Sequence, residues 1–149
     1  MSRRPPWIFL LPTAGLWSRR RHEKPQLELA QSLGAFPRPG GNISPLFIFF
    51  TVANVGESDT TIAELRVESK GGSPVPFGKL KGEKYLPYTL TSGEEIRFWV
   101  RAKKLARALK DEGYDGRPRV KLVVVGTSGD RYEKRFRFRV DEYLVLKDE

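Results

Sequence analysis

The sequence predicts an all-β domain, a sandwich of about seven strands with one short crossover helix and an extended N-terminal arm. Two observations support this prediction. From residue 25 onward, short apolar runs with alternating polarity are separated by turns rich in glycine and proline. In addition, Leu46 to Gly56 and Leu86 to Val100 each join a strand-like apolar run to a turn built on glycine. The 149 residues suffice for one domain whose core needs no disulfide or metal.

The first half of the domain contains the strongest strand signal. Residues 46–54 are almost continuously apolar, which indicates a central strand covered on both faces. Asn54 and Gly56 lie at its end, and both residue types tolerate positive φ in a turn. Residues 26–31 predict a first strand. In residues 60–68 the alternation changes phase, which indicates a bulge or a bend. We expect a short edge strand between Val75 and Leu80.

The next strand and the helix are predicted by two different periodicities. In residues 94–101, Ile96, Phe98 and Val100 point to the core, and the intervening residues point outward. In residues 102–112, apolar residues recur at the spacing of one helix face, and Gly113 is well placed to end that helix. We expect this helix to cover one end of the sandwich.

The last two strands, residues 119–126 and 131–140, form a hairpin whose turn is set by parity. Even-numbered residues carry the apolar face on both strands, so even must pair with even across the hairpin. A three-residue loop, Thr127 to Gly129, satisfies this condition, with Gly129 in the left-handed conformation. Val123 and Val125 then fall on the outer face. We expect the N-terminal arm or a partner to cover them.

Two short motifs resemble those of a known class of domains. Thr51 to Gly56 looks like the V-x-N-x-G strand and turn of CARDB-like and related immunoglobulin-like accessory domains, and Leu90 to Glu94 resembles their L-x-x-G-E turn. The resemblance covers about residues 25–143. It implies an immunoglobulin-like β-sandwich used for binding, spacing or structure. The chain is also similar to small bacterial proteins in which a hydrophobic N-terminal anchor precedes such a domain.

Residues that could perform chemistry are scarce. The chain has no cysteine, and its single histidine, His22, lies in the basic arm. Acidic residues mostly adjoin lysine or arginine, as on solvated faces. Acid–base catalysis needs converging titratable groups, and metal sites need clustered ligands. We therefore expect no enzyme activity, no cofactor, no metal and no small-molecule substrate.

Residues 1–24 form a basic arm distinct from the domain at residues 25–149. The arm holds six cations and one carboxylate, a net charge of +5 out of +9. Its apolar stretch, Trp7 to Trp17, is shorter than a membrane span and contains Pro12. It can be an interfacial anchor, an arm that docks on a partner subunit, a signal peptide without a clear cleavage site, or a disordered tail. The arm's candidate contact residues are Arg3, Arg4, Trp7, Trp17, Arg19, Arg20 and Arg21.

The body offers a second candidate contact surface. By parity, cations point outward on three strands, and an immunoglobulin-like order can bring these strands into one sheet around an exposed tryptophan. Such a face can bind phosphates and stack a base, although outward cations also protect sheet edges. These residues are Arg97, Trp99, Arg101, Arg119, Lys121, Arg135, Arg137 and Arg139.

The expected function is that of a non-catalytic interaction or structural module. The first hypothesis is a protein partner or assembly, bound through the arm and the basic sheet face. The alternatives are an anionic membrane surface and a nucleic acid or other polyanion. We expect a cytoplasmic protein, with membrane association as the alternative.

Overall fold

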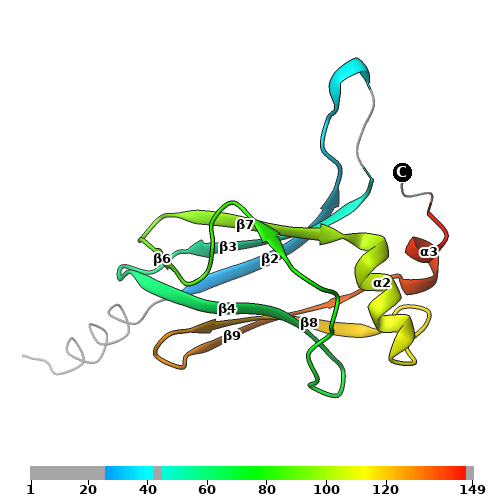
Figure 1. Cartoon of the computed structure of the whole chain (residues 1–149). Helices are drawn as coiled ribbons and strands as arrows, with labels where there is room; N and C mark the ends of the chain where they lie inside the picture. The colour runs from blue at the N-terminus through cyan, green and yellow to red at the C-terminus, as the bar shows by residue number, and fades with distance from the viewer. Residues whose placement is uncertain (1–25, 42–44, 147–149) are drawn as a thin grey trace, which may run out of the picture.

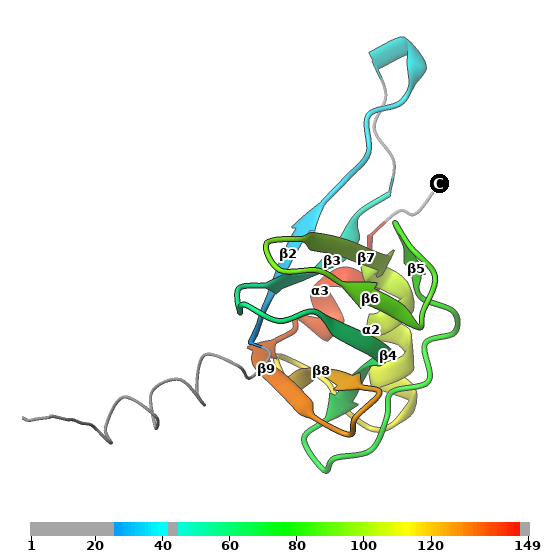
Figure 2. The same cartoon turned by 90° about the vertical axis from the view of Figure 1, so that its left-hand side faces the viewer.

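The computed structural model describes residues 26–41 and 45–146, and in this part the chain is mostly β. Its eight strands form two antiparallel sheets of four (Figures 1 and 2). The prediction of an all-β domain is therefore confirmed. The first sheet has the order β2 (Leu27–Gly34), β3 (Phe47–Asn54), β7 (Glu95–Arg101) and β5 (Lys81–Gly82).

The second sheet faces the first and has the order β6 (Tyr88–Leu90), β4 (Thr60–Ser69), β8 (Arg119–Gly126) and β9 (Arg131–Arg137). Only β2–β3 and β8–β9 connect strands that are neighbours in the same sheet. All the remaining connections, from β3 to β8, cross from one sheet to the other. In β4 the register shifts between Ile62 and Glu64, which confirms the predicted bulge.

The core lies between the two sheets. Strand β3 contributes Ile48, Phe50 and Val52, all with at most 1% of their surface exposed. Strand β3 lies between β2 and β7, as expected of a central strand, and its other face is covered by aromatic side chains. Burial of such apolar side chains is the main source of stability in a domain of this size. The facing strands supply Ile62, Val67, Leu90, Val120, Leu122 and Val124.

Helix α2 (Ala102–Asp111) closes one end of the sandwich between β7 and β8 (Figure 1). Its predicted apolar stripe is buried, and Leu105 and Leu109 are fully inaccessible. Gly113 has φ 93°, a conformation that favours glycine, and its N–H donates to the carbonyl oxygen of Lys110. The predicted crossover helix is thus observed.

Asn54 joins the two motifs that stood out in the sequence. Its side-chain amide donates to the carbonyl oxygens of Leu90 and Ser58, each at 2.9 Å, and its Oδ1 accepts from the N–H of Gly56 at 3.0 Å. The backbone N–H of Gly93 also donates to the carbonyl oxygen of Asn54. Gly56 has no positive φ, so the turn after β3 depends on the Asn54 side chain rather than on a left-handed residue.

The β8–β9 hairpin has the predicted register. Val120 lies opposite Phe136 and Val124 opposite Tyr132, so even residues pair with even residues. The loop contains three residues between Gly126 and Asp130, and Gly129 has φ 93°. Parity of the apolar residues was therefore enough to predict both the register and the turn.

The predicted final strand is too long. Strand β9 ends at Arg137 rather than at residue 140, and a short helix, α3 (Val140–Leu144), follows. The last ladder pair is Arg119 with Arg137. Phe138 still donates its N–H to the carbonyl oxygen of Pro118 at 3.2 Å, but Pro118 on the neighbouring strand has no N–H to return the bond, so the reciprocal pairing ends. Arg139 consequently precedes α3 and is not part of a sheet face.

The short edge strand is displaced from its predicted position. It lies at Lys81–Gly82, opposite Trp99 and Phe98, rather than between Val75 and Leu80. Proline at positions 74 and 76 removes backbone donors on both sides of Val75, which disfavours a strand there. Val75 and Phe77 instead bury their side chains in the core.

Candidate anion-binding surface

The outward residues of β7 lie on the outer face of the first sheet. The Trp99 side chain is half-buried, with its ring centre 5.5 Å from that of Phe36 and 6.2 Å from that of Phe49. The Arg97 guanidinium lies 5.6 Å from the centre of the Phe49 ring and 3.7 Å from the Glu83 carboxylate. Trp99 is thus a packed member of an aromatic cluster, not an isolated exposed ring.

The predicted single plane of cations around Trp99 is wrong. Arg97 and Arg101 belong to the first sheet, whereas the outward residues of β8 and β9 belong to the second. The two outer faces point away from each other. Alternation along a strand specifies which side chains point outward, but it does not specify the sheet, and α2 carries the chain from one sheet to the other between β7 and β8.

Five cations do come together on the second sheet, and we call them the basic cluster. Arg119 lies directly opposite Arg137, and Lys121 directly opposite Arg135. Like charges at directly opposite positions destabilise an antiparallel pair. A hollow of about 240 Å³ lies among several of these side chains. The cluster consists of Lys70, Arg119, Lys121, Arg135 and Arg137.

Little negative charge compensates the basic cluster. Within residues 26–41 and 45–146, Lys70, Arg119 and Arg135 have no carboxylate within 4 Å. Lys121 is the partly compensated member, because it lies opposite Glu68 of β4 and approaches Glu133 at 3.6 Å. Arg137 donates to the carbonyl oxygen of Arg117 at 3.4 Å. An array of this kind attracts carboxylates or phosphates, and arginine can bind either group through two parallel hydrogen bonds.

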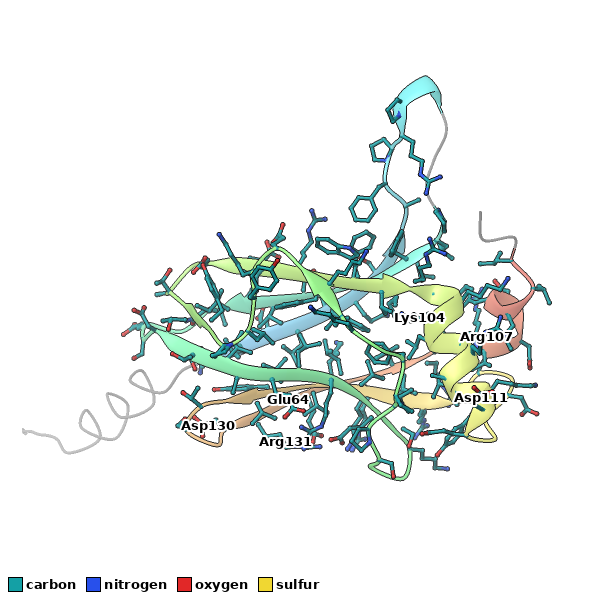
Figure 3. The ribbon with its side chains drawn as sticks, in the orientation of Figure 1. Glu64, Lys104, Arg107, Asp111, Asp130 and Arg131 are labelled. Atoms are coloured by element: carbon teal, nitrogen blue, oxygen red, sulfur yellow. The ribbon has the colours of Figure 1, made fainter. Side chains whose placement is uncertain are left out.

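The other half of the same outer face holds an ion-pair network around Glu68. Only 3% of the Glu68 side chain is exposed, although it lies on an outer face. One of its oxygens accepts from Arg66 at 2.8 Å and the other from Arg131 at 2.6 Å. Arg66 also binds Glu64, and Arg131 also binds Glu133. Figure 3 labels Glu64 and Arg131 of this network. The network consists of Glu64, Arg66, Glu68, Arg131 and Glu133.

The network determines the ionisation of its central carboxyl group. Burial acts to raise the pKa of Glu68, but the hydrogen bonds from Arg131 and Arg66 outweigh it, so this pKa lies below its ordinary value. The hydrogen bond from Arg131 likewise lowers the pKa of Glu133. Both carboxylates are therefore charged at neutral pH, and the network carries two positive and three negative charges.

Val123 is covered by this network. Its side chain is fully buried on the outer face, and its cross-strand neighbours are Arg66 and Glu133. Long charged side chains can cover apolar surface with their aliphatic parts. The burial of Val123 therefore requires neither the arm nor a partner, contrary to our expectation, whereas Val125 remains half-exposed.

A third group of cations contains Arg101, which was among the candidate residues, and three others that were missed in the sequence. Arg101, Lys103, Lys104 and Arg107 line a hollow of about 330 Å³ where α2 begins, and Figure 3 labels two of them. Lys103 also donates to the carbonyl oxygen of Leu146 at 2.8 Å. The signal was present, because positions 103, 104 and 107 lie within about one turn of a helix.

The remaining predicted residues do not join either surface. Arg139 lies at the start of α3, 3.4 Å from Glu142. All seven candidate residues of the arm, from Arg3 to Arg21, lie outside the described residues. The described part contains no group of three or more histidine or acidic residues able to hold a metal, and no helix there is long and apolar enough to cross a membrane.

Comparisons with known proteins provide a weak structural likeness and no family. No family model and no curated protein matches the chain. A solved structure described as "X-ray structure of Northeast Structural Genomics Consortium target SoR45" is 12% identical, with a TM-score of 0.34. That likeness covers 84% of this chain and 93% of the other.

Proposed function

We propose that the protein is a non-catalytic interaction module that binds an acidic protein surface through its basic cluster. The observation behind the proposal is the two adjacent cross-strand pairs of like charge, Arg119 with Arg137 and Lys121 with Arg135. Each such pair costs up to about 1 kcal/mol relative to a neutral pair. A partner carboxylate bound between them would relieve this repulsion, and the arginine forks match its geometry.

Within this proposal, the fold is an immunoglobulin-like sandwich of the kind that the CARDB-like accessory domains represent. The V-x-N-x-G and L-x-x-G-E segments are in direct contact, with Asn54 bonded to Leu90 and Gly93, which supports that assignment. Sandwiches of this class host many functions, so the binding role rests on the charged surface rather than on the fold.

The position of Trp99 favours a protein over a single-stranded nucleic acid. Proteins that bind single strands combine cations with aromatic rings on which the bases stack. Trp99 lies in the other sheet, and no aromatic side chain lines the hollow beside Lys70 and Arg119. The proposed role of the arm in membrane or partner binding stays a prediction, since residues 1–24 lie outside the described part.

The test is binding of the full chain to fluorescently labelled poly-L-glutamate, measured by anisotropy at low and physiological salt. We expect saturable binding whose affinity falls with rising salt, because the contacts are between opposite charges. Arg135→Glu should weaken binding at least fivefold at low salt.

Lys134→Glu is the matched control. Lys134 is adjacent to Arg135, is exposed, and faces the opposite side of β9, so both variants change the net charge equally. We expect less than a twofold effect. Equal effects of the two variants, or no binding by the wild type, would overturn the proposal. Tighter binding to duplex DNA of matched charge would favour the nucleic-acid alternative instead.

A further inference from the structure

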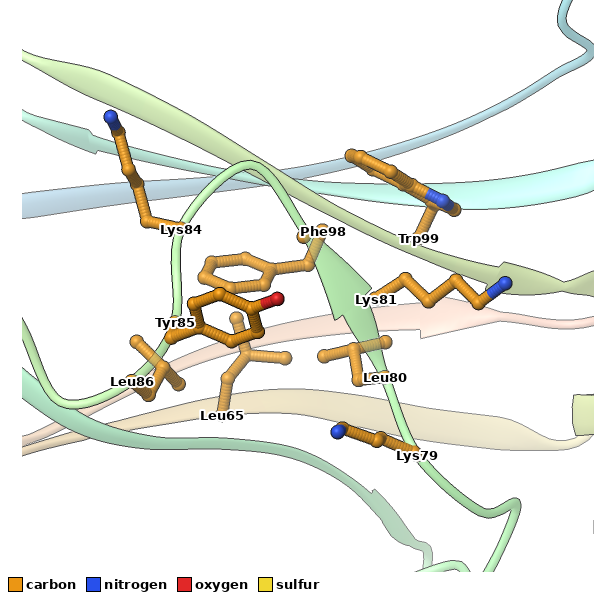
Figure 4. A pocket seen from close by; sticks show the side chains of 10 residues that line it. Leu65, Lys79, Leu80, Lys81, Lys84, Tyr85, Leu86, Phe98 and Trp99 are labelled. Atoms are coloured by element: carbon orange, nitrogen blue, oxygen red, sulfur yellow. The ribbon is translucent and has the colours of Figure 1, made fainter.

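The side of the molecule opposite β2 and β9 contains a cavity that the proposed function does not use. There β5 ends one sheet and β6 ends the other, and residues 83–87 connect these two strands beside the cavity. The cavity has a volume of about 630 Å³ (Figure 4). This lies within the range of sites that hold small organic molecules.

The interior of the cavity is apolar and receives side chains from both sheets. Leu65 comes from β4 and Phe98 from β7, and both belong to the core. Leu80 and Leu86, which are partly buried, complete the apolar lining. Gly82 lets β5 lie directly against Phe98, since a Cβ at this position would be 2.3 Å from the Phe98 ring. The cavity is thus an open hollow at the edge of the core, with the nearly buried Leu65 and Phe98 at its base.

The rim of the cavity is positively charged. Lys79, Lys81 and Lys84 line it, all three side chains are exposed, and no carboxylate lines it. Glu83 is the one acidic residue between Lys79 and Leu86, and it is bound to Arg97. Its carboxylate accepts from the Arg97 backbone N–H at 2.9 Å and lies 3.7 Å from the Arg97 guanidinium. In Figure 4 the three lysines surround the apolar and aromatic side chains.

Tyr85 adds an unusual feature at the mouth. Its side chain is 88% exposed, the highest value among the exposed large apolar side chains of the described residues. An aromatic ring next to an apolar cavity can bury much of its surface against an occupant, and burial of apolar area favours binding.

We propose that this cavity binds an amphipathic organic anion, a molecule with an apolar chain or fused-ring body and one carboxylate or sulfonate group. The body lies against the partly buried Leu80 and Leu86, the anionic group stays at the rim beside Lys79 and Lys81, and Tyr85 covers the body. Charge complementarity supports this occupant, because an apolar interior alone would accept a neutral molecule equally well, whereas three lysines without a carboxylate favour an anion.

The first test is a fluorescence titration of the full chain with 1-anilinonaphthalene-8-sulfonate, an aromatic sulfonate. We expect saturable binding at one site. Dodecanoate should displace the probe at least tenfold more effectively than dodecanol, which has the same chain length and no charge. Equal displacement by the acid and the alcohol would exclude a role for the lysines and overturn the proposal.

Variants then locate the site. Lys79→Glu combined with Lys81→Glu should weaken probe binding at least fivefold, and Tyr85→Ala about threefold, with unchanged thermal unfolding because all three side chains are exposed. Arg119→Glu combined with Arg135→Glu is the control of equal charge change in the basic cluster, and it should leave probe binding unaltered. An equal loss in both double variants, or no loss in either, would show that the probe does not bind at this cavity.

Discussion

The two halves of the outer face of the β6-β4-β8-β9 sheet use the same strands and similar residues to opposite effect. Near the β8–β9 loop, the ion-pair network encloses Glu68 and covers Val123. Toward the other end, the basic cluster places arginine opposite arginine and leaves its cations, apart from the half-buried Lys121, exposed to solvent. The difference lies in the carboxylates. Lys121, where the two regions meet, lies opposite Glu68 and 3.6 Å from Glu133, whereas the next pair, Arg119 with Arg137, has no carboxylate beside it in the described part of the chain.

This contrast separates charge that stabilises the fold from charge that is available for a partner. A guanidinium held between two carboxylates is engaged within the chain, and binding it elsewhere would require breaking those contacts. A guanidinium facing another guanidinium is repelled within the chain and is stabilised by an external anion. The comparison can be tested by changing each half separately.

The largest effect should come from Glu68→Ala in the network. The substitution leaves Arg66 and Arg131 without their common acceptor and exposes Val123, so we expect a loss of about 2–3 kcal/mol in the free energy of unfolding. Urea denaturation measures it. Glu64→Ala removes a carboxylate that is 55% exposed and should cost less than about 0.5 kcal/mol. Similar losses in the two variants would contradict the special position of Glu68.

Protonation of Glu68 should lower the free energy of unfolding by less than the Glu68→Ala substitution, since the side chain stays in place. Its pKa is lower in the folded than in the unfolded chain, so its contribution is complete above the ordinary glutamate pKa, near 4.3, and is lost as the pH falls through the folded value. Urea midpoints from pH 7 to pH 2.5 should therefore fall less steeply in Glu68→Gln than in the wild type. Glu133, whose pKa is also lowered by its hydrogen bond from Arg131, is present in both proteins, so the difference between them reports Glu68. Parallel plots of urea midpoint against pH for the two proteins would exclude a contribution of Glu68 ionisation to stability.

The smallest effect, of opposite sign, is expected in the basic cluster. Arg137→Glu converts the pair with Arg119 from like to opposite charge, which should stabilise the fold by a few tenths of a kcal/mol up to about 1 kcal/mol. The same variant should bind poly-L-glutamate more weakly. Calorimetric unfolding and the anisotropy assay measure the two quantities. A loss of stability would show that the cations are not in repulsion.

Much of the fold could be predicted from the sequence because its signals are local. The bulge in β4, the stripe of α2 and the β8–β9 register all follow from alternation, helical spacing or parity within one or two segments. The early end of β9 was missed because its cause, Pro118, lies on the partner strand. Sequence patterns along one strand do not report which backbone groups the neighbouring strand offers.

The candidate site could be predicted only in part, for a related reason. Parity correctly placed Arg119, Lys121, Arg135 and Arg137 outward. It wrongly assigned Arg97 and Trp99 to the same face, because the local sequence does not indicate to which of the two sheets a strand belongs. The cavity near Tyr85 and the role of Lys70 arise from the long connection between β4 and β6, whose path depends on tertiary packing. This connection is rich in glycine, proline and lysine, and it has no regular periodicity that would predict its path.

The composition of β9 restricts how a partner can approach. This strand forms one edge of its sheet, and edges expose backbone groups onto which a foreign strand can add. Five of its seven residues are charged: Arg131, Glu133, Lys134, Arg135 and Arg137. Such an edge resists strand addition, so a partner must recognise β9 through its side chains rather than by extending the sheet, and two copies of the chain have little tendency to join there when the protein is concentrated.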